Sequence, residues 1–98
     1  MTASNGIISN NVFEDCCHET DNTYDALHLV GGTQRNIITG NRIYSAATND
    51  MRYGINLSAS SCANNIVSNN IVTDAQSGQI NDAGTGTVTD GSNITHRS

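Results

Sequence analysis

Four polar residues of types that bind sugars recur at matched positions in this chain: Tyr24, His28, Arg52 and Asn56. His28 lies between two leucines and Asn56 lies between an isoleucine and a leucine, which is the alternation of a β-strand. If the apolar neighbours point inward, both polar side chains point outward. The same alternation puts Tyr24 and Arg52 on that outer face. We expect the four residues to form a carbohydrate-binding patch across two neighbouring strands, and the alternative is a set of solvated side chains on a sheet face.

Acidic residues offer a second kind of chemistry. Paired carboxylates cleave glycosidic bonds, and clusters of carboxylate oxygens hold Ca²⁺. No calcium-loop spacing is present, so we expect solvated loops and no cofactor, with Ca²⁺ as the alternative. Six of the nine acidic residues gather in two segments: Glu14, Asp15, Glu19, Asp21 and Asp25 in one and Asp50 in the other.

The elements that position these residues are indicated by an internal repeat. The template Asn-x-Ile-x-x-Asn-x-(Ile/Val) begins at Asn5, Asn36 and Asn64, and the starts are 31 and 28 residues apart. This spacing suits one coil of a solenoid with a protruding loop. Three-residue to five-residue segments are too short to be stable alone, so each must stack in parallel on its equivalent in the next coil.

Each copy of the template predicts a bend at its second asparagine. Asparagine tolerates left-handed φ, and its side-chain amide can bond the equivalent amide above and below. Asn10, Asn41 and Asn69 are therefore predicted to form a ladder along the stack, beside inward columns of isoleucine and leucine.

A second repeat keeps phase with the first. Ala26–Leu29 begins ten residues before Asn36, and Gly54–Leu57 begins ten residues before Asn64. Ser77–Ile80 is interpreted as the third copy, and the degenerate segment 86–91 replaces the Asn template. The sequence thus predicts an all-β solenoid of about three coils without substantial helix.

Composition narrows the functional classes. Fourteen Asn, eleven Thr and ten Ser, with no Pro or Trp, are typical of strands and tight turns. A net charge of −5 with only four basic residues disfavours nucleic acid as a partner. No apolar run approaches the roughly 18 residues of a membrane span, so no membrane partner is expected, and Met1–Ser4 does not open a signal peptide.

The three template copies and the closing Gly84–Val88 resemble the right-handed parallel β-helix repeats of the pectate-lyase-like superfamily, over roughly residues 5 to 93. That group includes pectin-cleaving enzymes, alginate epimerases and phage tailspikes. The resemblance implies a fragment containing the C-terminal coils of a larger extracellular or virion-associated protein. We expect residues 1–96 to be a single β-helix fragment and interpret 97–98 as a cloning remnant.

The resemblance leaves three functions open. The first is a scaffold and glycan-binding segment without stand-alone catalysis. The second is a polysaccharide lyase, epimerase or hydrolase, in which Arg52 neutralises a uronate carboxylate and His28 or Tyr24 moves its C5 proton. The third is a structural module that forms homo-oligomers through exposed coil ends, which leave apolar stacks and unpaired strand edges.

The cysteines add little chemistry. Cys16 and Cys17 are adjacent and Cys62 is distant, a pattern that forms neither a disulfide framework nor a Cys-x-x-Cys metal pair. We expect them to be buried as small apolar residues.

Overall fold

The computed structural model describes residues 4–14, 25–44, 51–73, 75, 77–89 and 93–96. Within these residues all regular structure is β-strand and none is helix, so the predicted all-β class is confirmed. The strands are β1 (Ile7–Ser9), β2 (Val12–Glu14), β3 (Leu27–Leu29), β4 (Ile37–Thr39), β5 (Arg42–Tyr44), β6 (Tyr53–Leu57), β7 (Ile66–Ser68), β8 (Ile71–Thr73), β9 (Gly78–Asp82), β10 (Val88–Thr89) and β11 (Ile94–His96).

The strands form three sheets, and every pairing between them is parallel. Sheet 1 has the order β1-β4-β7-β10, sheet 2 has the order β2-β5-β8-β11, and sheet 3 has the order β3-β6-β9. Each sheet therefore takes every third strand of the chain. We call β1–β3 the first pass, β4–β6 the second, β7–β9 the third, and β10–β11 the last.

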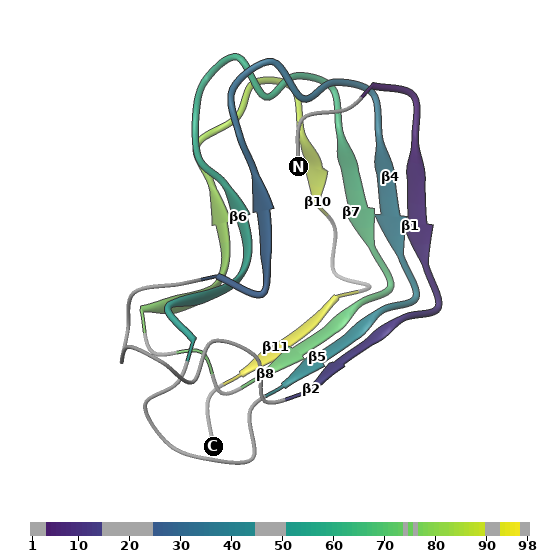
Figure 1. Cartoon of the computed structure of the whole chain (residues 1–98), viewed down its shortest axis with the longest axis vertical. Coiled ribbons are helices and arrows are strands. Elements are labelled where there is room, and N and C mark those ends of the chain that lie inside the picture. The colour runs from purple at the N-terminus through teal and green to yellow at the C-terminus, as the bar shows by residue number, and fades with distance from the viewer. Residues whose placement is uncertain are drawn as a thin grey trace.

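The three sheets surround one interior (Figure 1). In this view the strands of sheets 1 and 2 lie side by side in the order given above, the two sheets meet at a corner, and sheet 3 lies opposite sheet 1. A strand of three residues has too few contacts to be stable alone. Its stability comes from the strand of the next pass and from the side chains that fill the interior.

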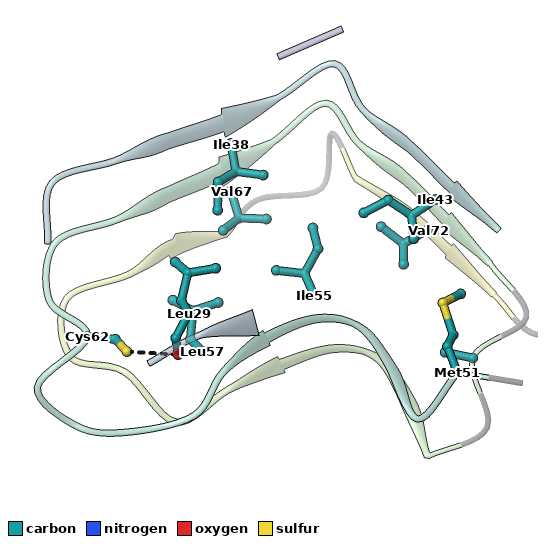
Figure 2. Packing of buried hydrophobic residues seen from close by; sticks show 10 residues of the cluster. Leu29, Ile38, Ile43, Met51, Ile55, Leu57, Cys62, Val67 and Val72 are labelled. Atoms are coloured by element: carbon teal, nitrogen blue, oxygen red, sulfur yellow. Dashed lines mark hydrogen bonds between the residues drawn. The ribbon is translucent and has the colours of Figure 1, made fainter. Parts of the chain in front are cut away.

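The interior is filled by columns of like residues from successive passes (Figure 2). Ile38 stacks on Val67, Ile43 on Val72, and Leu29 on Leu57, and all six side chains are fully buried. Each such side chain contributes on the order of 1.5–3 kcal/mol through removal from water. Cys62 is also buried, as predicted, and its thiol donates to the Leu29 carbonyl; Cys16 and Cys17 lie outside the described residues.

Two columns of left-handed residues produce the bends between strands. One column precedes sheet 1, and the other separates sheet 1 from sheet 2. Left-handed φ is costly for most residues and cheapest for glycine and asparagine, so these types recur there. The first column is Asn5 (φ 61°), Arg35 (φ 54°), Asn64 (φ 58°) and Gly86 (φ 67°), and the second is Asn10 (φ 57°), Gly40 (φ 68°) and Asn69 (φ 54°).

The residue after each bend of the second column belongs to an asparagine ladder, which Asn93 continues in the last pass: Asn11, Asn41, Asn70 and Asn93. Asn41 and Asn70 are buried. At Asn70 the side-chain Oδ1 accepts both the backbone N–H and the Nδ2–H of Asn41, at 3.0 and 3.1 Å. Its Nδ2 donates to Asn93 Oδ1 at 3.1 Å and to the Ile38 carbonyl at 3.0 Å. One side chain thus links three passes, and we call this set the Asn11 ladder.

A second, shorter set follows the bends of the first column. Asn36 donates its backbone N–H and its Nδ2–H to Asn65 Oδ1, at 3.0 and 3.1 Å, and accepts the Gly6 N–H at 2.8 Å. Asn65 also donates to the Thr33 carbonyl at 3.1 Å. Both asparagines are fully buried. Their hydrogen bonds remove the penalty that unpaired buried amides would impose.

The predicted ladder of Asn10, Asn41 and Asn69 is therefore wrong by one residue at two of its three members. Asn10 and Asn69 are exposed bend residues, whereas Asn41 is the ladder residue of its pass. The cause is that Arg35 and Gly40 stand at bends where the other passes carry asparagine. The repeat template was therefore aligned one residue too late in the second pass, where Asn36 and Asn41 follow the bend residues.

The template also aligns Ile7 and Ile66 with Ile38, which the structure does not. Ile7 and Ile66 pair with Ile37 on the outer face of sheet 1, and the inward column is Ile8, Ile38 and Val67. A shift of one residue exchanges the two faces of a strand, because side chains alternate.

In sheet 3 the first two copies of the short repeat have the predicted register, with Leu27 opposite Ile55. The third copy was placed two residues out: Ile80 lies opposite Ile55, and Asp82 lies opposite Leu57. Asn81 consequently becomes the equivalent of Asn56.

Substitution of Asn70 by alanine tests the ladder. The change leaves the backbone and side-chain N–H groups of buried Asn41 without their acceptor and removes the donor to Ile38. We expect a loss of about 3 kcal/mol in the free energy of unfolding, measured by chemical denaturation.

The neighbouring Asn69→Gly variant is the matched control, because glycine readily adopts the left-handed φ of 54° found there. Its cost should stay below about 1 kcal/mol. Equal losses for the two variants would show that the bend, not the buried ladder, provides the stability.

Candidate functional site

The polar residues predicted to form a patch meet around one buried carboxylate on the outside of sheet 3. We call the set Asp25, His28, Arg52, Asn56 and Asn81 the Asp25 cluster. Parallel pairing of β3, β6 and β9 places His28, Asn56 and Asn81 in one column across the sheet. Asp25 and Arg52 lie at the approach to β3 and β6.

Asp25 is the centre of the hydrogen bonding. Its Oδ1 accepts from Arg52 Nε at 3.0 Å and from the Tyr53 backbone N–H at 3.1 Å. Its Oδ2 accepts from Arg52 Nη2 at 2.7 Å and from Asn56 Nδ2 at 2.9 Å. The bidentate pairing with Arg52 fixes the planes of both groups. Only 1% of the Asp25 side chain is exposed, so the carboxylate is a structural anchor rather than a group facing solvent.

The electrostatics of the pair follow from this geometry. Burial alone would raise the pKa of Asp25, but hydrogen bonds from Arg52 and Asn56, the positive charge of Arg52 and the Tyr53 N–H together hold that pKa below its usual value. The Asp25 hydrogen bond in turn raises the pKa of Arg52, with burial opposing it. Both groups are therefore charged at neutral pH, and the pair is neutral overall.

The groups that face solvent are His28 and the outer edge of Arg52, whose side chains are 43% and 37% exposed. His28 Nδ1 lies 4.0 Å from Asp25 Oδ2, beyond hydrogen-bond length. The Arg52 guanidinium carbon is 5.3 Å from the centre of the Tyr53 ring, so an aromatic face borders the cluster. Asn81 extends the column by donating to Asn56 Oδ1 at 2.8 Å.

Gly54 fixes the position of the start of β6, directly after Arg52 and Tyr53. A β-carbon on Gly54 would collide with the Val72 side chain and lie 2.9 Å from the Gln79 carbonyl oxygen. The absence of a side chain lets this strand pack close against β8 and β9. The backbone that carries Arg52 and Tyr53 is thereby set against buried side chains, which makes the outer cluster a rigid one.

The structure thus brings together His28, Arg52 and Asn56 of the predicted patch, and Tyr24 lies outside the described residues. Sequence reasoning missed Asp25 as the hub, because it grouped that residue with the other acids of its segment. It also missed Asn81, because the third copy of the repeat was placed two residues out. Alignment of Asp25 with Tyr53 through the Leu27–Ile55 register would have put the acid beside Arg52.

The other predicted acids give no site within the described part of the chain. No group of three or more His, Cys, Asp or Glu side chains is arranged there to hold a metal ion. Asp15, Glu19, Asp21 and Asp50 lie outside it, and Glu14 ends β2. Those same described residues contain no helix long and apolar enough to cross a membrane.

Comparisons with known proteins return nothing that would assign a function. No protein-family model matches the chain, and no curated protein sequence or solved structure matches it. The resemblance to β-helix proteins stays a prediction from the repeats.

The lowered pKa of Asp25 predicts an acid dependence of stability. The unfolded chain has an aspartate pKa of about 3.9, so the stabilisation is complete above that pH and is lost as pH falls through the lower folded-state pKa. Asp25→Asn should be less stable than the unmodified chain at pH 7, and the difference should shrink as the pH falls below about 4.

Urea denaturation of both proteins at several pH values measures this difference. All other carboxylates are shared, so the comparison isolates Asp25. A stability difference that is constant from pH 7 down to about pH 2.5 would contradict the assignment of Asp25 as a charged partner of Arg52.

Proposed function

We propose that this chain is a segment of a right-handed parallel β-helix of the pectate-lyase-like kind, and that the outer face of sheet 3 binds a glycan without catalysing a reaction of its own. The recurrence of one strand per sheet in each pass, with parallel pairing throughout, supports the solenoid. The right hand follows from the strong preference of parallel crossover connections.

The observation that carries the binding proposal is the prearranged polar column beside an aromatic ring. His28 and Asn81 belong to different passes, and rungs of a sheet repeat at about 4.8 Å. A linear oligosaccharide along the stack would therefore meet a new polar group at each rung. Sugar hydroxyls both donate and accept, so imidazole, amide and guanidinium groups suit them, and the Tyr53 ring provides an apolar edge.

The charge of the cluster favours a neutral glycan over a polyuronate. Asp25 already occupies Nε and Nη2 of Arg52, so the pair offers no net positive charge to a sugar carboxylate. The chain itself carries a formal charge of −5, which repels a polyanion. A neutral glycan is affected by neither feature, because its hydroxyl groups carry no charge.

Catalysis has weaker support than binding. A lyase or epimerase needs a base that reaches the substrate and an arginine that neutralises its carboxylate. The carboxylate of the Asp25 cluster is buried with four donors around it, and Arg52 is neutralised by it. Glycoside hydrolysis uses two carboxyl groups, and this cluster contains one. We therefore rank an enzyme using Tyr24, His28 and Arg52 second.

A segment of this kind suits a larger extracellular or tailspike-like protein. In such a protein the β-helix is a scaffold, and glycan contacts are added on its outer faces. The parent protein would supply further coils and any catalytic residues.

Titration with neutral and uronic-acid oligosaccharides tests the proposal. We expect binding of a neutral oligosaccharide that changes little with salt, and no binding of polyuronates. His28→Ala and Asn81→Ala should each weaken binding by about fivefold, the value of one or two hydrogen bonds.

Thr39→Ala is the control, because Thr39 lies in sheet 1 rather than sheet 3 and forms no part of the Asp25 cluster. Its affinity should equal that of the unmodified chain. Absence of binding to every neutral glycan, or equal weakening by Thr39→Ala, would refute a glycan site at the Asp25 cluster.

A further inference from the structure

The first residue of β6, Tyr53, lies on the outer face of sheet 3. A β-carbon on Gly54 would point into the interior, at Val72, so the alternation of the strand directs Tyr53 outward. The strand is paired with β3 on one side and with β9 on the other. The Tyr53 ring therefore belongs to the middle of the stack and to neither of its ends.

A glycine in the next pass leaves room for this ring. Gly78 lies opposite Tyr53 in the register of β6 and β9. A β-carbon on Gly78 would lie 3.3 Å from Cε1 and 3.4 Å from Cδ1 of the ring. One edge of the ring thus lies where the side chain of a larger residue would stand. The absence of a side chain at Gly78 lets the ring extend over the third pass.

The outer edge of Arg52 adjoins the ring. Nε and Nη2 of Arg52 donate to Asp25, whereas Nη1 has no acceptor among the described residues. The guanidinium carbon is 5.3 Å from the ring centre, the Arg52 side chain is 37% exposed, and Tyr53 is half-buried. The two N–H groups of Nη1 are therefore available to a ligand beside an aromatic ring. We call Arg52 Nη1 and the Tyr53 ring the Tyr53 subsite.

The chemistry of the Tyr53 subsite restricts the group that can fill it. Arginine donates and never accepts, so the ligand atom at Nη1 must be an acceptor. Asp25 already neutralises the guanidinium, which favours a neutral acceptor such as the carbonyl oxygen of an amide. The ring beside it favours an apolar group. An acetamido group carries a carbonyl oxygen and a methyl group on the same carbon, so it meets both requirements.

We infer that the Tyr53 subsite binds the N-acetyl group of an amino sugar. The carbonyl oxygen accepts from Arg52 Nη1, and the methyl group packs against the Tyr53 ring. This inference rests on the proposed glycan function and names the sugar class, a neutral glycan that contains an N-acetylhexosamine. A sugar with a hydroxyl group in place of the acetamido group keeps an acceptor but lacks the methyl group, so it binds less tightly.

Matched pairs of sugars test the inference: N-acetylglucosamine and glucose, N-acetylgalactosamine and galactose, and N-acetylmannosamine and mannose. Within each pair only the group at C2 differs. In NMR titrations of the unmodified protein we expect the acetylated member of at least one pair to bind about fivefold more tightly, from the buried methyl group and the better acceptor. Saturation transfer from protein to sugar should be strongest at the acetyl methyl protons.

Tyr53→Leu should remove most of this preference and the strong transfer to the methyl group. Leucine keeps an apolar side chain and the backbone N–H that donates to Asp25. Tyr44→Leu is the matched control, because Tyr44 lies in sheet 2 with the Arg42 guanidinium carbon 4.7 Å from its ring centre. This variant should leave the preference unchanged.

Three outcomes would overturn the inference: equal binding within every pair, a preference that survives Tyr53→Leu, or no binding of any acetylated sugar. Each of them concerns the Tyr53 subsite alone. The glycan function itself is decided separately, by the oligosaccharide titration and the His28→Ala and Asn81→Ala variants.

Discussion

The buried asparagine ladder is the interaction on which the rest of this structure depends. Each strand is too short to hold its own register, and the apolar columns alone would accept a slip along the strand direction. A buried side-chain amide opposes such a slip, because the displacement would leave its oxygen and both its hydrogens without hydrogen-bond partners. Asn41 and Asn70 therefore fix where each pass lies on the previous one. The price in buried polarity is offset by complete hydrogen bonding: no described buried side-chain nitrogen or oxygen lacks a partner.

The Asp25 cluster depends on that register. Asp25 and Arg52 come from different passes, 27 residues apart in sequence, and their bidentate contact requires the two passes to be in correct alignment. The same alignment brings His28, Asn56 and Asn81 into one column. The ladder and the Asp25 cluster lie on different sides of the molecule but belong to the same passes. The ladder therefore also sets the alignment of the cluster. This separation of scaffold and site is common in repeat folds, where outer residues change without disturbing the inner columns.

The inward positions change in character along the stack. Where a pass continues the stack, its inward residues are apolar and its ladder position is asparagine. Thr89 occupies the inward position that follows Val67, and Asp82 occupies the one that follows Leu57, although Asn93 continues the ladder.

The sequence by itself determined the period of the repeat, the parallel stacking and the all-β character of the described residues, because short alternating segments cannot be stable alone. It also placed His28 opposite Asn56, because both lie in segments with the same apolar spacing. The register at Arg35 and Gly40, and with it the members of the ladder, was decided only by the tertiary structure. The bend residues share a left-handed φ rather than one identity: arginine, glycine and asparagine all occur there, at lowest cost for glycine and asparagine, whereas a sequence match treats the three as different. Asp25 became the hub for a similar reason: its acidic neighbours look alike in sequence, and only the folded chain shows which carboxylate lies against Arg52.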